Sequence, residues 1–302
     1  MQNNLNKLLS AFVMLLLSVS GLAQTASKQE LSIKLTSPDK PFRLSIGLLE
    51  GYITIITYSG KDILVEAEAN PKKKKPEPNA NSNPNPNSNS NGNLNADVNS
   101  LRQKKETTSV SGRYVAVTEN DNTVTISPVD TYNSISVTIK VPKNTVKLNL
   151  GIALGGGVTV KDISGEAEVN NPNGSIALTN VSGSVVATTI TGNITVTFAS
   201  VTENAPMAFS SLIGKIDVTF PRSLKANMNV QSDAGTLFTD YHIVFGGPAP
   251  KVDTVNAPTL YRTAIAGKLS GKINGGGPEI LMKNMNGNIY IRRARQPDTP
   301  AQ

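Results

Sequence analysis

Glycine recurs every nine residues through the middle of this chain, and this spacing restricts the fold more than any other feature. The glycines are Gly156, Gly165, Gly174, Gly183 and Gly192. Apolar residues recur two positions after each glycine, at Val158, Ala167, Ile176, Val185 and Ile194. They recur again four positions after it, at Val160, Val169, Leu178, Ala187 and Val196, and two positions before it, at Ile163, Pro172, Val181 and Ile190. Five copies in register are typical of a repeat architecture.

Nine residues suffice for one short strand and one corner. A strand of five or six residues points every second side chain inward, and glycine occupies corners that need positive φ or close backbone approach. Two units, or 18 residues, would then close one coil of a flattened solenoid and stack the apolar positions into columns. A meander of short hairpins is the alternative, but it does not require so constant a period.

Composition agrees with a thin, stacked β-structure. Only 5% of the residues are aromatic, and the chain has no tryptophan and no cysteine. Two further segments, residues 135–141 and 146–154, alternate apolar and polar residues as a sheet with one solvated side does. The repeat continues more loosely around Gly214, Gly235, Gly271 and Gly287. We therefore predict an all-β, single-domain β-solenoid, a β-helix-like stack of short strands in nine-residue units marked by glycine.

A long insertion with a different composition interrupts this domain. It opens with four lysines and then places asparagine at every odd position from Asn79 to Asn95, which predicts disorder. The expected organisation is a signal peptide (1–23), N-terminal strands of the main domain (24–70), the disordered Lys/Asn/Pro-rich insertion (71–106), the solenoid body (107–293) and a polar tail (294–302).

The N-terminal segment has the pattern of an export signal. Lys7 precedes an apolar run from Leu8 to Val19, and Gly21 and Ala23 are small residues at the positions that a signal peptidase reads. The apolar run is short for a membrane-spanning helix. The sequence therefore predicts cleavage before Gln24, no membrane span afterwards, and a location in the periplasm, on the outer-membrane surface or outside the cell.

The formal net charge of +7 belongs mostly to the insertion. Residues 71–106 hold seven basic and three acidic side chains, which leaves little excess charge on the folded part. An exported protein with this charge distribution is not expected to bind nucleic acid.

Three segments carry a resemblance to a known family. They are GSIALTNVSGSVVATTITGNITVTF (174–198), GKIDVTFP (214–221) and GKINGGGPEILMKNMNGNIYIRR (271–293). These segments resemble the adhesin-like β-solenoid domains of exported bacterial proteins, a family largely of unknown function, over roughly residues 40–70 and 107–293. The signal-peptide ending SVSGLAQ is similar to those of Bacteroidetes proteins. The resemblance implies a β-solenoid and an adhesion role, and it implies no particular binding residues.

The sequence offers no constellation that predicts catalysis, a cofactor or a metal. Calcium-binding repeats of this period need a column of aspartates, and the successive corners here form no such column. His242 is the only histidine, so it cannot build the usual zinc site, even with Asp233 or Asp240 nearby. We expect His242 to be a strand residue with a structural role.

The favoured function is therefore a non-enzymatic, adhesin-like envelope module that binds an unidentified glycan or protein. A carbohydrate-active enzyme is the alternative, because Asp162, Glu166 and Glu168 lie on neighbouring units and glycoside cleavage takes two carboxyl groups. That region contains no aromatic residue to bind a sugar ring. Self-association through exposed terminal coils is a third hypothesis.

Overall fold

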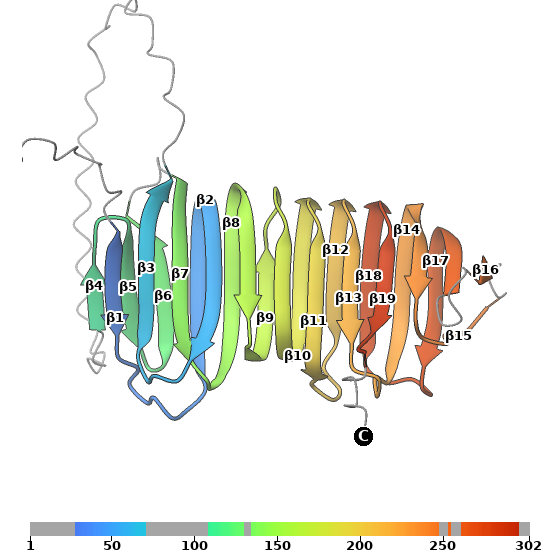
Figure 1. The fold of residues 1–302 in the computed structure, drawn as a ribbon, viewed down its shortest axis with the longest axis horizontal. Coiled ribbons are helices and arrows are strands. Elements are labelled where there is room, and N and C mark those ends of the chain that lie inside the picture. Colours follow the sequence, from blue (N-terminus) through green and yellow to red (C-terminus); the bar gives the residue numbers. More distant parts are fainter. Residues whose placement is uncertain (1–27, 71–107, 130–133, 248–252, 255–260, 296–302) are drawn as a thin grey trace, which may run out of the picture.

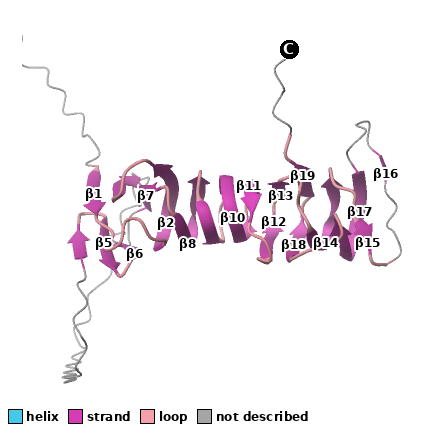
Figure 2. Cartoon of the chain, turned by 90° about the horizontal axis from the view of Figure 1, so that it is seen from below, coloured by secondary structure: helices cyan, strands magenta, loops and turns pink. Residues whose placement is uncertain are grey.

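The computed structural model describes residues 28–70, 108–129, 134–247, 253–254 and 261–295, and every regular element in these ranges is a β-strand. The predicted all-β fold is therefore confirmed. The predicted signal peptide, the insertion at 71–106 and most of the C-terminal tail lie outside the described residues. Figure 1 shows an elongated stack of strands, and Figure 2 shows the same stack from below.

Within the described ranges, nineteen strands form one continuous hydrogen-bonded sheet. The first nine are β1 (Gln29–Ile33), β2 (Phe42–Tyr58), β3 (Ile63–Asn70), β4 (Thr108–Ser111), β5 (Val115–Asn120), β6 (Thr123–Pro128), β7 (Ser134–Pro142), β8 (Thr145–Lys161) and β9 (Ser164–Asn170). The next five are β10 (Ile176–Thr191), β11 (Ile194–Val201), β12 (Met207–Ile213), β13 (Ile216–Phe220) and β14 (Ala226–Thr239). The last five are β15 (Val244–Phe245), β16 (Asp253–Thr254), β17 (Tyr261–Ile273), β18 (Glu279–Asn286) and β19 (Ile289–Arg293).

The strands of the central region pair in parallel with a shift of one coil. Val158 lies beside Ile176, and Ile176 lies beside Ile194. On the opposite side Gly165 lies beside Gly183. Each of these steps is 18 residues, so two nine-residue units close one coil as the sequence predicts. The meander alternative is wrong for this region, because hairpins would pair neighbouring units in antiparallel fashion.

Each coil crosses the stack twice and so contributes to two faces. Face 1 comprises β7, the second half of β2, the second half of β8, the first half of β10, β11, β13 and β19. Face 2 comprises β6, the first halves of β2 and β8, then β9, the second half of β10, β12, β18 and the first half of β14. The core lies between the two faces.

The apolar columns predicted at two and four residues after each glycine fill this core. All ten residues of the two columns are at most 3% exposed, from Val158 and Val160 to Ile194 and Val196. Toward the C-terminal end, three phenylalanines thicken the core: Phe198 stacks on Phe220, with 5.2 Å between ring centroids, and both meet the ring of Phe209 edge-on.

The residues two positions before the glycines are not all buried. Ile163 and Val181, which precede Gly165 and Gly183, are buried, but Ile190 is 49% exposed. The glycines therefore mark two different corners. We call the corner at Gly165 and Gly183 the apolar corner, and the one at Gly51, Gly156, Gly174, Gly192, Gly214 and Gly287 the polar corner.

The two corners differ in the residue that points inward just before the turn. At four of the six polar-corner glycines (Gly174, Gly192, Gly214 and Gly287), a polar side chain three residues before the glycine is buried and donates a hydrogen bond to the glycine carbonyl of the preceding coil. The bonds run from Asn171 to Gly156 (3.5 Å), from Thr189 to Gly174 (3.1 Å), from Ser211 to Gly192 (3.0 Å) and from Asn284 to Gly214 (2.7 Å). Because side chains alternate along a strand, the next residue points outward.

The coils are not stacked in chain order. The coil of β18 and β19 lies between the coil of β12 and β13 and the terminal strand β14, which Figure 1 shows in red between two orange strands. Gly271, which sequence analysis placed in the loosened repeat, lies instead in antiparallel β17 opposite Met228. The C-terminal continuation of the repeat was therefore only partly correct.

Both ends of the stack consist of antiparallel strands. At one end β1 pairs with β3, β3 with β7, and β4 and β5 extend from β6; at the other end β17 pairs with β14. The buried carboxylate of Glu119 fastens the first end, since its Oε1 accepts hydrogen bonds from the Thr36 hydroxyl at 2.9 Å and the Asn122 amide at 2.9 Å.

A glycine at the corner is required by contact with the coil below. At Gly183 φ is +155°, and a Cβ atom there would lie 1.7 Å from the carbonyl oxygen of Gly165. At Gly151, within β8, φ is not positive and a Cβ atom would meet nothing within 4 Å. Only the first position therefore forbids a side chain.

We predict that Gly183→Ala lowers the free energy of unfolding by about 3 kcal/mol or more, because it adds backbone strain and a steric clash. Gly151→Ala should change it by less than about 1 kcal/mol. Urea denaturation of both variants measures the difference. Equal stabilities of the two variants would contradict the close packing of glycines between coils.

Candidate ligand-binding surfaces

Face 1 presents rows of outward side chains that continue from coil to coil. The registers place Thr54, Thr159, Ala177 and Thr195 side by side in one row, which continues into Asp217 and Tyr290. The adjacent row holds Lys161 beside Thr179 and, after a register shift between β10 and β11, Thr197 beside Thr219 and Arg292. Neighbouring members of a row are separated by the strand spacing, about 4.8 Å.

The middle of face 1 carries no charge. The outward residues in, and immediately before, the first half of β10 and β11 are Ser175, Ala177, Thr179, Asn193, Thr195 and Thr197. Hydroxyl and amide groups therefore dominate a flat surface between Lys161 and Lys215. Such a surface suits a ligand that offers many weak hydrogen-bonding groups rather than one charged group.

A charged and aromatic cluster ends the uncharged rows on the side of β13 and β19. The Arg292 guanidinium donates from Nε to Asp217 Oδ1 at 2.6 Å and from Nη2 to Asp217 Oδ2 at 3.2 Å. The Lys215 ammonium lies 3.3 Å from Asp217 Oδ2. The hydrogen bond to Asp217 raises the pKa of Arg292 above its ordinary value. The carboxylate is thus shared by two cations and largely buried.

Two aromatic rings extend this cluster. Tyr290 stacks on Phe238 with 4.9 Å between centroids, and the Arg292 guanidinium lies 4.8 Å from the centroid of the Tyr290 ring. The rings come from β19 and β14, which are adjacent in space but about fifty residues apart in sequence. The cluster could not be predicted from the sequence, because nothing in the glycine spacing indicates that β19 and β14 lie side by side.

The two residues before His242 are fixed by hydrogen bonds to other parts of the fold. Burial raises the pKa of Tyr241, and its hydroxyl donates toward the Pro221 carbonyl at 2.7 Å. Asp240 accepts the Arg293 amide at 3.1 Å. His242 itself is exposed and lies between β14 and β15, so the expectation that it is a strand residue is wrong.

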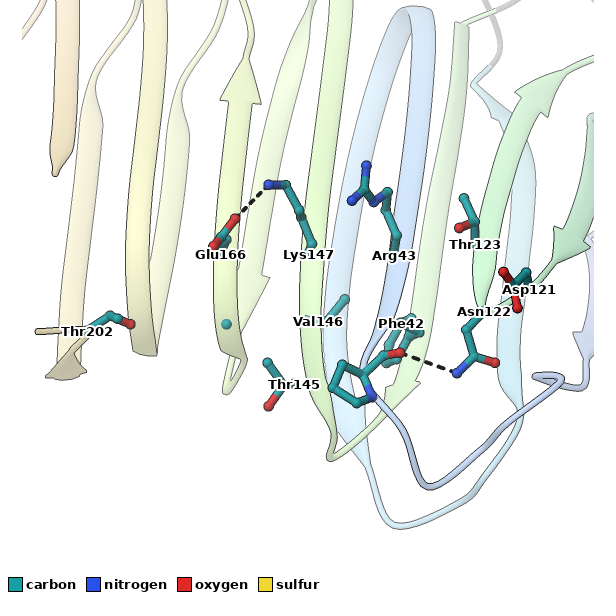
Figure 3. A pocket seen from close by; sticks show the side chains of 12 residues that line it. Phe42, Arg43, Asp121, Asn122, Thr123, Thr145, Val146, Lys147, Glu166 and Thr202 are labelled. Carbon is teal, nitrogen blue, oxygen red and sulfur yellow. Dashed lines mark hydrogen bonds and ion pairs between the residues drawn. The ribbon is translucent and has the colours of Figure 1, made fainter. Parts of the chain in front are cut away.

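Face 2 contains a shallow depression of about 520 Å³ across β6, β2, β8 and β9 (Figure 3). The registers align Thr123, Arg43, Lys147 and Glu166 along it. Lys147 and Glu166 form an ion pair at 2.7 Å, and Asn122 donates to the Pro41 carbonyl at 3.3 Å. The lining holds two cations, Arg43 and Lys147, and two carboxylates, Asp121 and Glu166, so the depression has no strong preference for one sign of charge.

The three acidic residues considered for glycoside cleavage do not form a common site. Glu166 and Glu168 point outward from β9 on face 2, and Glu166 is paired with Lys147. Asp162 lies at the apolar corner with φ of +57°, where it accepts a hydrogen bond from Asn180 at 2.7 Å. Asn180 occupies the equivalent position one coil later, so Asp162 serves the stacking of the coils.

The described residues offer neither a metal site of the usual kind nor a membrane-spanning helix. No group of three or more histidine, cysteine, aspartate or glutamate side chains there could hold a metal ion. No helix in the described part of the chain is long and apolar enough to cross a membrane.

Comparison with known proteins gives a family match and one solved structure. Residues 156–292 match the model of the Toastrack DUF4097 family, which covers the repeat and the C-terminal coils but not the N-terminal strands. No curated protein sequence matches the chain. A crystal structure of a "putative cell adhesion protein" from Clostridium sporogenes is 10% identical, covers 89% of this chain and 99% of its own, and has a TM-score of 0.38.

The cluster at Asp217 makes a prediction about stability. Asp217→Ala should lower the free energy of unfolding by about 1–3 kcal/mol, because two charge-assisted hydrogen bonds to Arg292 are lost from a largely buried carboxylate. Asp162→Ala is the matched control at an exposed corner and should cost less. Denaturant titration checks both, and an Asp217→Ala variant as stable as the native chain would show that the cluster is not a fixed unit.

Proposed function

We propose that this chain is an exported, non-enzymatic envelope module that binds an extended glycan along face 1. The observation that carries the proposal is the uncharged hydroxyl and amide array at the centre of that face. Thr159, Thr195 and Thr197 belong to rows that repeat with the coil, so a polymer lying along the stack would meet the same groups several times.

A repeated array favours a long ligand over a small one. Each hydroxyl contributes little by itself, because a neutral hydrogen bond to an exposed group replaces a bond to water. Several weak contacts along one polymer act together, since the first contact raises the local concentration for the next. A glycan offers hydroxyl groups at every sugar unit and fits this chemistry.

The absence of a shared carboxylate site among the described residues supports a binding rather than a catalytic role. Glu166 is engaged by Lys147 and Asp162 by Asn180, as described above. Export is supported by Lys7, the apolar run that follows it and the small residues before Gln24. An envelope location would bring face 1 into contact with polysaccharide.

The test measures retention of the purified chain on immobilised envelope polysaccharides and on isolated cell walls. We expect the native chain to be retained and Thr195→Glu to weaken binding at least about tenfold, because a carboxylate would interrupt the uncharged array. Thr125→Glu places the same charge at an exposed threonine of β6 on face 2 and should bind as the native chain does.

Two results would overturn the proposal. One is a native chain that none of these polymers retains, and the other is equal loss of binding in Thr195→Glu and Thr125→Glu. The N-terminus of the protein recovered from the envelope fraction should be Gln24, and recovery from the cytoplasm with an intact N-terminus would refute export.

A further inference from the structure

One long edge of the stack exposes a large apolar side chain at nearly every coil. These residues stand two positions before the glycines of the polar corner. We call them the apolar edge ladder: Leu49, Leu154, Pro172, Ile190, Leu212 and Met285. Leu154 is 57% exposed, Ile190 49%, Leu212 41% and Met285 50%. A single exposed leucine is ordinary, but a column of them is not.

The outward direction of the ladder is built into the corner. Thr189 and Ser211 point inward to hydrogen-bond the glycine carbonyls, so the residues that follow them, Ile190 and Leu212, must point outward. At the apolar corner the equivalent residues Ile163 and Val181 are buried. For Ile190, Leu212 and Met285, each of which follows such a buried polar residue, the exposure therefore follows from a repeated structural feature. Leu49 and Leu154 lie where the pairing of β2 with β8 shifts register.

The ladder is continuous in space. Thr189 pairs with Ser211 and Ser211 pairs with Asn284, which places Ile190, Leu212 and Met285 on three adjacent strands. Pro172 is adjacent to Ile190, because the Ile190 amide donates to the Pro172 carbonyl at 2.9 Å. Successive side chains are therefore about 4.8 Å apart, and six of them span roughly 25 Å.

The area of the ladder is near that of an interaction site. With Ile213, which is also 50% exposed beside Leu212, it presents on the order of 500 Å² of apolar surface. A standard protein interface takes about 800 Å² from each partner, so the ladder and its uncharged margins approach the area that a dimer requires.

The margins of the ladder are uncharged through its central coils. On the face 2 side the nearest outward residues are Asn170, Thr188 and Ser210, and on the corner itself Asn173 and Thr191 follow the ladder residues. Covering a charged side chain without a partner would cost desolvation energy. The residues named here are all uncharged, so covering this strip carries no such cost.

We propose that the apolar edge ladder is the contact surface between two copies of this chain. A row of side chains with the spacing of β-strands is matched along its whole length only by a surface with the same repeat. A second copy offers that repeat, the same apolar side chains and the same uncharged margins. The side chains of one ladder can therefore pack between those of the other. The pairing is lateral, along the solenoid, and leaves face 1 and both ends of the stack free.

The oligomeric state of the full chain in solution tests the proposal directly. Sedimentation equilibrium of the full chain should show a dimer that dissociates on dilution. The double variant Leu154→Lys and Leu212→Lys should be monomeric, with dimerisation weakened at least about 100-fold. Val186→Lys is the control, since Val186 is 41% exposed on face 2 away from the ladder, and it should dimerise as the native chain does.

Crosslinking locates the contact, because the natural chain has no cysteine that could form a competing disulfide. Ile190→Cys lies near the middle of the ladder and should form a disulfide between two copies, whereas Val186→Cys should not. A native chain that is monomeric at all concentrations overturns the proposal, and so does a double variant that still dimerises. Flotation of a monomeric native chain with phosphatidylethanolamine–phosphatidylglycerol vesicles would assign the ladder to lipid and overturn it as well. Glycan retention in the preceding test does not depend on these outcomes.

Discussion

The close approach of one coil's backbone to the next is the constraint on which this structure depends. Parallel strands of successive coils must turn at the same place, and at each turn the backbone of one coil passes over the backbone of the coil before it. At Gly156 and Gly183 a single added Cβ atom would fall within 2 Å of the carbonyl oxygen below. Glycine at these positions therefore sets the length of the coil, and the coil length sets the register of every apolar column.

The register explains how a chain with 5% aromatic residues and no disulfide forms a core. Val158, Ile176 and Ile194 lie directly above one another, and all are fully buried. Small and β-branched side chains fill the narrow space between the two faces without large rings. The antiparallel strands at both ends then terminate the stack, which leaves the outward rows and the corners as the surfaces for partners.

Sequence alone predicted those parts of the fold that are local to the repeat. The period of nine, the 18-residue coil and the two buried columns all follow from the spacing of Gly156 to Gly192. The insertion of β18 and β19 before β14 could not be predicted, because nothing in the spacing from Gly214 to Gly287 specifies spatial order. The polar corner was also missed, although Asn171, Thr189, Ser211 and Asn284 stand at one constant offset. Their side chains are polar, and polar residues were assumed to face solvent.

The surfaces were less predictable than the core for a related reason. The array of Thr159, Thr195 and Thr197 requires only the coil length, so it could have been read from the repeat. The pairing of Tyr290 with Phe238 requires the out-of-order stacking of the C-terminal coils. The ladder of Ile190 and Leu212 requires knowing that the preceding polar residue is buried, which the amino-acid types by themselves do not show.

The 18-residue parallel coil is tested most directly by nuclear Overhauser contacts in a methyl-labelled sample. The structure predicts contacts between the methyl groups of Val158 and Ile176 and between those of Ile176 and Ile194, at the separation of neighbouring strands. Cross-strand contacts between α-protons of adjacent nine-residue units, with the 18-residue contacts missing, would instead identify antiparallel hairpins and contradict the solenoid.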